Sequence, residues 1–322
     1  MTQKNKILIF GGAGFIGHHL VNLLQSKHDI CVYDNFNIFG ITHERIKKQI
    51  IQDRTKQWYN VDTVNGSVIG HSLIQDTIDN FKPEIIINLA AYPRVSLSEK
   101  YPVLSAEGMV QGLINTMGYD VKKYVHVTTP EVYGSTNEGW IKESINFSPN
   151  TPYAVSRAAC DLHLLSFYKA YNFPVVFTRA ANVFGPGQYG DSPYATAVSA
   201  WCHAIKNGLE CRSDGDGEQT RDMCYIDNVV HANIQASNCF GPFKGECYNV
   251  ACGDKVSNNE ILDHLKNRFG DKVKVKTAPE RAGDVKHTQA DISKIRRQIG
   301  YTVQKHFWEG LDETIAWWGL DE

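Results

Sequence analysis

The stretch KILIFGGAGFIGHHL, residues 6–20, decides how this chain folds. The run KILIF is apolar, as in a buried strand, and a helical pattern follows the glycines. Gly11, Gly14 and Gly17 stand between the two with the spacing G-x-x-G-x-x-G. Such glycines allow a tight turn, a close approach of the backbone to a pyrophosphate, and close packing of helix on strand. The stretch therefore predicts a dinucleotide site formed by Gly11, Gly14, Phe15, Ile16 and Gly17.

An acidic residue extends this prediction to the identity of the dinucleotide. Asp34 ends the next apolar run, DICVYD (29–34), and Asn35 follows it. A carboxylate at this place accepts hydrogen bonds from the adenosine ribose hydroxyls and repels a 2′-phosphate. No arginine follows immediately to reverse that preference. The predicted cofactor is therefore NAD rather than NADP, with Asp34 at its ribose and Asn35 among the residues that bind it.

Further apolar runs recur along the chain with helical patterns between them. They are EIIINLAA (84–91), KYVHVTT (123–129) and FPVVFTRAA (173–181). Continuous runs rich in Ile and Val are typical of strands that are buried on both faces. Helices between such strands imply parallel pairing with right-handed crossovers. The predicted fold is an α/β fold, a Rossmann-type doubly wound parallel sheet.

The composition changes after about residue 182, where Gly, Pro and Asp interrupt the chain in FGPGQYGDSP (184–193) and SDGDGEQTRD (213–222). One more strand is expected in GECYNVACG (245–253), followed by an amphipathic helix near 257–269. We expect an NAD-binding Rossmann domain in 1–181, together with 225–250. A smaller α/β substrate-binding region is expected in 182–224 and 251–322, over the carboxyl edge of the sheet.

Charge and composition argue against several classes of protein. The 322 residues carry a formal net charge of −2, so no basic field points to nucleic acid or to an anionic membrane. No apolar run reaches the roughly 18 residues of a membrane-spanning helix. The N-terminal stretch lacks a signal-peptide pattern, which predicts a cytoplasmic location. The eight cysteines include no C-x-x-C pair, so free thiols and no metal site are expected.

A set of motifs in a fixed order carries a family resemblance. The motifs are GGAGFIG (11–17), NLAA (88–91), TTPEVYG (128–134), YAVSR (153–157), RAANVFGPG (179–187), GDGEQTRDMCYIDNV (215–229), YNVACG (248–253) and ERAGDVKHTQADISK (280–294). Together they resemble the extended short-chain dehydrogenases/reductases, specifically the nucleotide-sugar epimerases and dehydratases. The resemblance covers nearly the whole chain and is more specific for the family than for the reaction.

The resemblance implies a borrowed redox step, in which NAD takes hydride from C4 of a nucleotide sugar and later returns it. Tyr153 matches the base that removes the C4 hydroxyl proton, and Thr129 matches a residue that hydrogen-bonds the same hydroxyl. The resemblance adds to the cofactor site a set of further residues: Ser67, Ala90, Ala91, Tyr153 and Arg157. It places four residues at the substrate, where guanidinium groups suit phosphates: Asn182, Arg221, Arg281 and Asp284.

Arg157 departs from the family pattern, because the family base motif is Tyr-x-x-x-Lys. The pKa of a free tyrosine is about 10, so such a base needs a nearby cation. Arginine keeps the positive charge but is planar and cannot release its proton. We expect a working site with an altered cation, and a degenerate site is the alternative. Three smaller departures are Met109 for an asparagine, Ser67 for an acid, and Asn88 for a histidine.

The tripeptide Thr129-Pro130-Glu131 bears on the choice of reaction. In the 4,6-dehydratases that this sequence resembles, a glutamate at the place of Glu131 removes the C5 proton. We therefore expect an NDP-hexose 4,6-dehydratase. The motifs after residue 214 resemble 4-epimerases at least as much, so an NDP-hexose 4-epimerase stays open. A third reading is a non-catalytic protein that binds NAD and nucleotide sugar.

Family members pair through a bundle of four helices. The segment 151–172 matches one helix of that bundle. The resemblance therefore implies a homodimer.

Overall fold

The computed structural model describes residues 4–38, 41, 43–92, 95–134, 140–191, 195–239, 244–280 and 286–321. Its centre is a parallel sheet of seven strands in the order β3-β2-β1-β4-β5-β6-β9. The strands are β1 (Lys6–Phe10), β2 (Asp29–Asp34), β3 (Val61–Asn65), β4 (Ile85–Asn88), β5 (Lys123–Thr128), β6 (Val175–Ala180) and β9 (Glu246–Val250). From β1 the strand order runs outward to β3 on one side, and from β4 it runs outward on the other side. The switch point of a doubly wound fold therefore lies between β1 and β4. The predicted fold class is confirmed.

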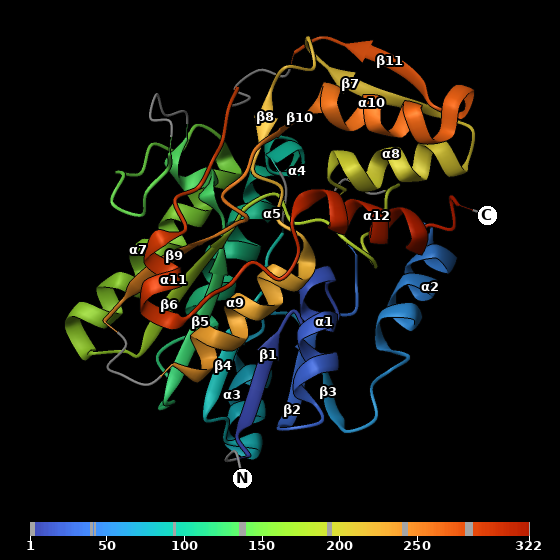
Figure 1. Cartoon of the computed structure of the whole chain (residues 1–322). Coiled ribbons are helices and arrows are strands. Elements are labelled where there is room, and N and C mark those ends of the chain that lie inside the picture. The colour runs from blue at the N-terminus through green and yellow to red at the C-terminus, as the bar shows by residue number, and fades with distance from the viewer. Residues whose placement is uncertain are drawn as a thin grey trace.

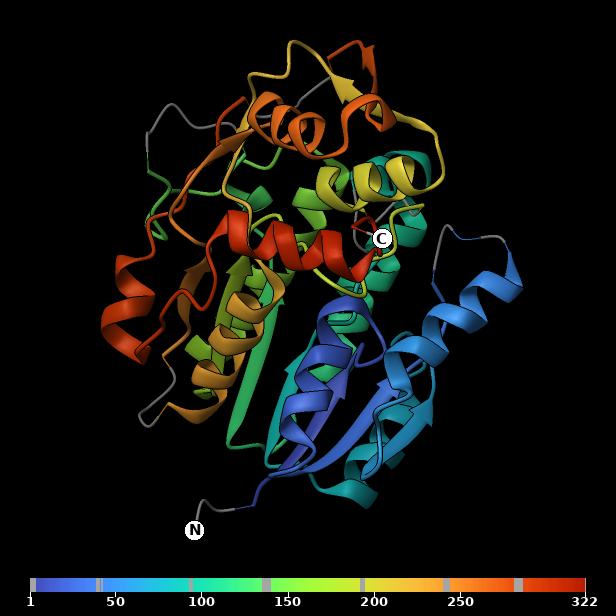
Figure 2. The ribbon, with the colours of Figure 1, turned by 45° about the vertical axis from the view of Figure 1, so that its right-hand side comes forward.

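Helices cover both faces of this sheet (Figures 1 and 2). Alternate residues of β1 belong to different cores: Ile7 and Ile9 pack in one hydrophobic cluster, and Leu8 and Phe10 pack in the other. The first core is closed by α1 (Phe15–Leu24) and α9 (Ile226–Asn238). The second is closed by α3 (His71–Phe81), η1 (Glu107–Gln111), α6 (Gly112–Thr116) and α7 (Pro152–Tyr171). Burial on both sides explains the continuous apolar runs.

One strand of the main sheet, β3, was not marked by any apolar run of the sequence. β3 pairs in parallel with β2, Ile30 opposite Val61, and forms one edge of the sheet. Its sequence VDTVN is polar because most of its residues face solvent. Apolar runs identify only strands buried on both faces, so this edge strand left no such signal. The strands that the sequence predicted agree with the observed strands within a few residues at each end.

Smaller elements lie above the carboxyl ends of the strands, at the top of Figure 1. β7 (Glu210–Asp214) pairs in parallel with β11 (Lys274–Ala278), and β8 (Thr220–Arg221) pairs antiparallel with β10 (Val256–Ser257). The helices here are α8 (Ala197–Lys206), α10 (Asn258–Phe269), η3 (Gly270–Lys272) and α12 (Phe307–Trp317). The predicted helix near 257–269 is α10, which begins with a capping box of Ser257 and Glu260.

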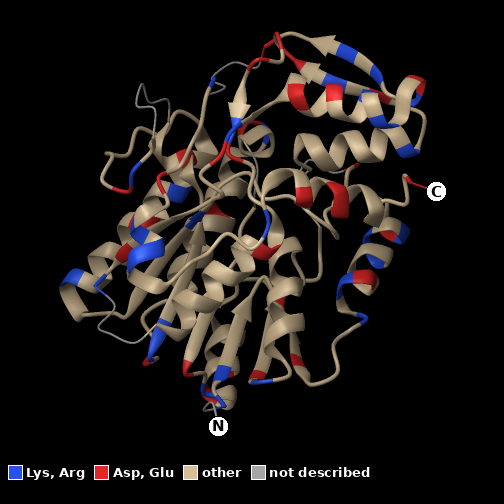
Figure 3. Ribbon diagram, viewed as in Figure 1, with Lys and Arg blue, Asp and Glu red and all other residues tan. Residues whose placement is uncertain are grey.

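The remaining described elements are α2 (Glu44–Thr55), α4 (Val95–Lys100), α5 (Pro102–Ala106), the short turn η2 (Pro130–Tyr133) after β5, and α11 (Ser293–Ile299). Lys and Arg are interspersed with Asp and Glu over the ribbon in Figure 3, in keeping with the net charge of −2. No helix among the described residues is both long and apolar enough to span a membrane. The same residues contain no group of three or more His, Cys, Asp or Glu side chains that could hold a metal ion.

Candidate functional site

The structure brings most of the sequence-predicted residues to one edge of the sheet. The glycine loop follows β1, Asp34 ends β2 and Ser67 follows β3. Ala90 and Ala91 follow β4, Thr129 follows β5 and Asn182 follows β6. Because all these strands are parallel, their carboxyl ends meet at one edge, where open α/β sheets bind their ligands.

The glycine loop has the geometry of a pyrophosphate cradle. Gly11 has φ 78°, and a Cβ on it would lie 2.9 Å from the backbone nitrogen of Ala90. A Cβ on Gly17 would lie 2.4 Å from the carbonyl oxygen of Gly11. Only glycine fits at either place, because the loop, β4 and the start of α1 are in close contact. No side chain caps α1 at Gly14, so the N–H groups of its first turn, at Phe15 and Ile16, are left for an anion. The residues present therefore fit a dinucleotide.

Asp34, predicted to bind the ribose, is fixed beside this cradle. One carboxylate oxygen accepts the N–H of Ala13 at 3.0 Å, and the other accepts the N–H of Phe36 at 2.8 Å. Burial raises the pKa of Asp34, while these N–H groups and the charge of Arg54 act in the opposite direction. Asn35 and Ser67 are exposed beside it. The Gly66 N–H bonds the Asp34 carbonyl, which holds the end of β3 against β2.

Sequence reasoning missed Arg54, in the last turn of α2. It is 8% exposed, and its guanidinium donates to the carbonyl of Ala13 in the glycine loop at 3.3 Å. A signal was present in the sequence. Ile46, Ile50 and Arg54 recur every four residues, so the arginine lies on the apolar face of its helix.

Thr129 and Glu131 lie on a short turn directly after the central strand β5. Thr129 is nearly buried, and its hydroxyl oxygen accepts the N–H of Glu131 at 3.3 Å. Pro130 opens the turn, where the missing N–H costs nothing. The turn packs against α7, the helix that carries Tyr153. Thr129 keeps its hydroxyl hydrogen free to donate to another group, because its oxygen is the acceptor in this cap.

Tyr153 and Arg157 occupy the first two turns of α7. Thr151 caps this helix by accepting the Ala154 N–H at 3.2 Å, and Pro152 begins it. Tyr153 is 8% exposed and Arg157 is 6% exposed. The guanidinium carbon of Arg157 lies 5.9 Å from the centre of the Tyr153 ring. The spacing therefore puts the cation beside the tyrosine, as expected for two residues one turn apart.

The guanidinium of Arg157 also contacts the backbone of β5. Its Nη2 donates to the carbonyl of Val127 at 2.9 Å. Pairing of β4 with β5 ends at Asn88 opposite His126, so Arg157 supplies a donor to the next carbonyl of β5. Burial lowers the pKa of His126 well below its usual value, and the charges of Arg157 and Arg179 add to this effect. The imidazole beside the arginine is therefore neutral at physiological pH.

Two of the predicted substrate residues lie near each other. Asn182 has φ 36°, and its side-chain amide donates to the carbonyl of Asp222, the residue after Arg221, at 3.2 Å. Arg221 donates to the carbonyls of Thr220 at 3.0 Å and Lys286 at 3.2 Å. The strained backbone at Asn182 is typical of functional positions. Arg281 and Asp284 lie outside the described residues.

Three further residues, Asn88, Met109 and Ser67, depart from the family pattern, and the structure describes all three. Asn88 is buried, donates to Thr116 and Tyr124, and accepts the Ala90 N–H at 3.0 Å. It therefore fixes the turn that carries the predicted cofactor residues after β4. Met109 is buried in η1, a π-helical turn. Ser67 caps its own turn by accepting the Ile69 N–H at 3.3 Å.

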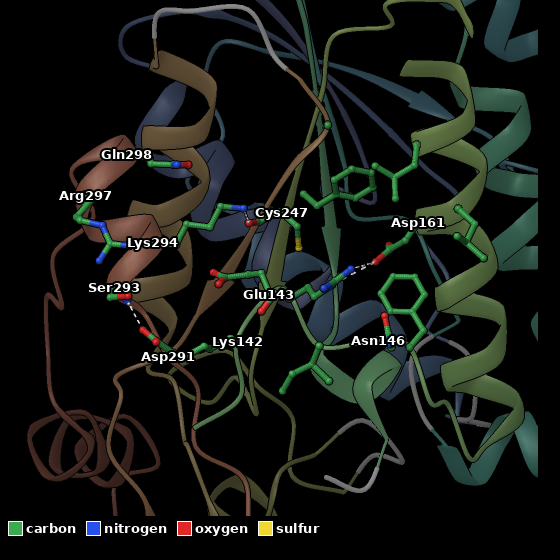
Figure 4. A pocket seen from close by; sticks show the side chains of 18 residues that line it. Lys142, Glu143, Asn146, Asp161, Cys247, Asp291, Ser293, Lys294, Arg297 and Gln298 are labelled. Carbon is green, nitrogen blue, oxygen red and sulfur yellow. Dashed lines mark hydrogen bonds and ion pairs between the residues drawn. The ribbon is translucent and has the colours of Figure 1, made fainter. Parts of the chain in front are cut away.

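A separate pocket of about 1150 Å³ lies between α7 and α11, under the loop 142–147 (Figure 4). Its lining includes a buried ion pair in which Arg179 donates to Asp161 at 2.8 Å. Arg179 also donates to the hydroxyl of Tyr133 at 2.6 Å. Its described lining contains none of the residues that the sequence predicted for the site, Arg281 and Asp284 being outside the described part of the chain. The ion pair and the Tyr133 contact join β6, α7 and η2, so they support the turn that carries Glu131.

Three comparisons with known proteins agree with this geometry. A dTDP-D-glucose 4,6-dehydratase of Dictyostelium discoideum is 31% identical over 286 residues, which are 81% of this chain and 62% of that protein. A UDP-N-acetylglucosamine 4-epimerase of Methanobrevibacter ruminantium, solved with UDP-N-acetylmuramic acid, superposes with a TM-score of 0.86 at 28% identity, over 100% of both chains. DesIV, the dTDP-glucose 4,6-dehydratase of Streptomyces venezuelae, solved with NAD bound, superposes with a TM-score of 0.85 at 27% identity, over 98% of this chain and 97% of that one.

The chain also matches the sequence model of a protein family. The sequence model described as "GDP-mannose 4,6 dehydratase" matches residues 8–314. The glycine cradle, Asp34 at the end of β2 and the tyrosine at the start of α7 are all inside that span. The chain belongs to the GDP-mannose 4,6 dehydratase family of extended short-chain dehydrogenases/reductases.

Proposed function

We propose that this protein is an NAD-dependent NDP-hexose 4,6-dehydratase. The observation that carries the proposal is the position of Glu131. It lies on the turn directly after the central strand β5, its N–H bonded to Thr129, and this turn packs against the helix of Tyr153. A carboxylate at this place suits removal of a proton next to a ketone.

The residues divide the reaction between them. Tyr153 accepts the proton of the C4 hydroxyl, and Thr129 donates a hydrogen bond to the same oxygen. NAD, when bound on the glycine cradle beside Asp34, supplies the hydride acceptor and donor that the reaction borrows. Glu131 then removes the C5 proton, which the C4 ketone has made acidic, and passes it to the C6 hydroxyl, which leaves as water. The hydride returns to C6, and C5 takes up a proton from solvent. Arg157 places positive charge beside the tyrosine ring throughout.

A second candidate is an NDP-hexose 4-epimerase. It is favoured by the full-length superposition on the UDP-N-acetylglucosamine 4-epimerase. In that case Tyr153 and Thr129 keep their roles, and the ketone intermediate rotates before it is reduced. Glu131 is then a structural acid.

Deuterium incorporation separates the two reactions. The protein is incubated with UDP-, dTDP-, GDP- and CDP-hexoses in deuterium oxide, and the products are examined by NMR. A 4-keto-6-deoxy product with deuterium at C5, lost in Glu131→Gln, is the expected result. A product inverted at C4 without label would assign the epimerase instead. Binding of NAD without turnover of any sugar would leave neither reaction standing.

We also propose a homodimer formed through α5 and α7. Both helices expose apolar side chains: Val103 on α5 is 69% exposed, and Val155 and Leu162 on α7 are 52% and 56% exposed. A helical interface between two copies would bury them. Light scattering on the purified protein should give twice the chain mass, and Leu162→Lys should shift it towards the monomer. A wild-type monomer would refute the pairing.

We also propose that the chain divides into an NAD-binding domain and a substrate-binding region. β9 joins the main sheet although it follows residue 224, whereas β7, β8, β10 and β11 form small separate sheets. The cytoplasmic location stays a prediction.

A further inference from the structure

Arg54 joins two loops that are far apart in the sequence. Its Nη1 donates to the carbonyl of Ala13 at 3.3 Å, and its Nη2 donates to the carbonyl of Gly187 at 3.3 Å. Ala13 belongs to the glycine cradle, and Gly187 belongs to the loop five residues beyond Asn182. One guanidinium therefore holds the cofactor side and the substrate side of the candidate site together.

The loop around Gly187 is held by the start of α1 as well. A ring nitrogen of His19 hydrogen-bonds the carbonyl of Pro186 at 2.9 Å. A Cβ on Gly187 would lie 2.9 Å from the ring of His18, so the loop lies directly against that ring. Gln188 is buried and accepts hydrogen bonds from Thr196 and Ser199. These contacts hold the loop in a fixed position relative to the glycine cradle.

The guanidinium is a buried cation whose hydrogen bonding is incomplete. Its Nε has no partner among the described residues, and both bonded partners are neutral carbonyls. Burial lowers the pKa of Arg54 to about 10, so it stays charged at neutral pH. Asp34 provides the favourable charge, although its oxygens are bonded to Ala13 and Phe36. An anion placed on the glycine cradle would add a second favourable charge.

We propose that Arg54 is a positioning residue that couples binding of the cofactor to binding of the nucleotide sugar. The inference rests on the proposed function of the two sites. A pyrophosphate on the cradle fixes Ala13 and stabilises the guanidinium behind it. The guanidinium then fixes Gly187, and through that loop the backbone of Asn182. By linkage, the nucleotide sugar strengthens cofactor binding by the same factor.

The coupling is measured directly with calorimetry on the full chain. The dissociation constant of NAD is determined alone and with saturating UDP, dTDP, GDP or CDP, and each nucleotide is titrated with and without NAD. The expected wild-type coupling is roughly 5-fold or more, in the usual range for linked sites. Arg54→Met should bring it to about 1. Arg54→Lys should retain most of the NAD affinity and still lose the coupling, because one ammonium does not span both carbonyls as a planar guanidinium does.

The controls make the outcomes distinct. Arg45→Met removes an exposed arginine from the same helix and should leave the coupling unchanged. Arg54→Gln serves if Arg54→Met does not fold. Coupling that persists in the Arg54 variants, or that is absent in a wild-type protein which binds both ligands, overturns the role of Arg54. Failure of the wild-type protein to bind NAD or any of the four nucleotides overturns the proposed function itself.

Discussion

The cofactor end and the catalytic end of the site each contain a buried arginine that bonds backbone carbonyls. Arg54 bonds Ala13 and Gly187, which belong to two loops far apart in the sequence. Arg157 bonds Val127, within the strand that carries Thr129. In both, Nε has no partner among the described residues. The same chemical group thus joins two regions at one end and stiffens a single strand at the other.

The two ends also differ in what the backbone requires. At the cofactor end the loop depends on glycine, because neighbouring backbone leaves no room for a side chain at Gly11 or Gly17. At the catalytic end the positions depend on caps, since Thr129 and Thr151 begin the turns that carry Glu131 and Tyr153. A steric requirement tolerates almost no substitution, whereas a cap costs about 1 kcal/mol when it is removed.

Removing the proposed base should have the largest effect and should separate the two ends. Tyr153→Phe deletes the hydroxyl that we propose accepts the C4 proton, so kcat should fall roughly 10²- to 10⁴-fold. NAD affinity should change little, because the glycine cradle is untouched. Turnover with the sugar that proves to be the substrate, and an NAD titration of the same sample, measure both effects. Retention of near wild-type kcat would exclude Tyr153 as the base.

Gly11→Ala tests the steric requirement at the cofactor end. A side chain at φ 78° costs about 1–2 kcal/mol, and its Cβ would also press against Ala90, at a further cost of about 1–3 kcal/mol. Gly300→Ala is the matched control, because Gly300 has φ 70° and a Cβ added to it would have nothing within 4 Å. Urea unfolding should show the larger loss for Gly11→Ala, together with weakened NAD binding. Equal losses would mean that contact with β4 is unimportant.

Arg157→Met and Arg157→Lys sharpen the comparison of the two arginines. Methionine leaves the Val127 carbonyl without its donor, which should cost about 1–3 kcal/mol of stability. It also removes the positive charge 5.9 Å from the centre of the Tyr153 ring, so kcat should fall. Lysine should restore the charge and recover part of kcat. The turnover rates and unfolding curves of all three proteins measure both effects, and equal turnover rates would remove Arg157 from catalysis.

Acid should weaken the cofactor end through His18. Burial, with the charges of His19 and Arg54, lowers the pKa of His18 to about 2. The unfolded chain takes up the proton below about pH 6.5, so stability is lost as pH falls, by up to about 2 kcal/mol between pH 7 and 5. His18→Gln should make the decline shallower, and the exposed His71→Gln should not. Parallel wild-type and His18→Gln curves would contradict the prediction.

A structural feature can be predicted from the sequence when it depends on residues that are neighbours in the chain. The glycine loop, the acid after β2 and the Tyr-x-x-x-Arg helix were predicted from short stretches, because each depends on neighbours in the chain. The parallel sheet followed from runs buried on both faces. The edge strand β3 was missed, since a half-exposed strand carries no continuous apolar run. Arg281 and Asp284 stay predictions.

The sequence by itself determined the sheet, the cofactor cradle and the identity of the tyrosine and its cation. Only the tertiary structure decided what the arginines contact. Arg54 meets Gly187 across 133 positions of sequence, and Arg157 meets Val127 across 30. A long side chain has many rotamers, and the one it adopts depends on which buried carbonyls lack a donor after the chain has folded. That information is absent from any local pattern, because the unpaired carbonyls exist only in the folded protein.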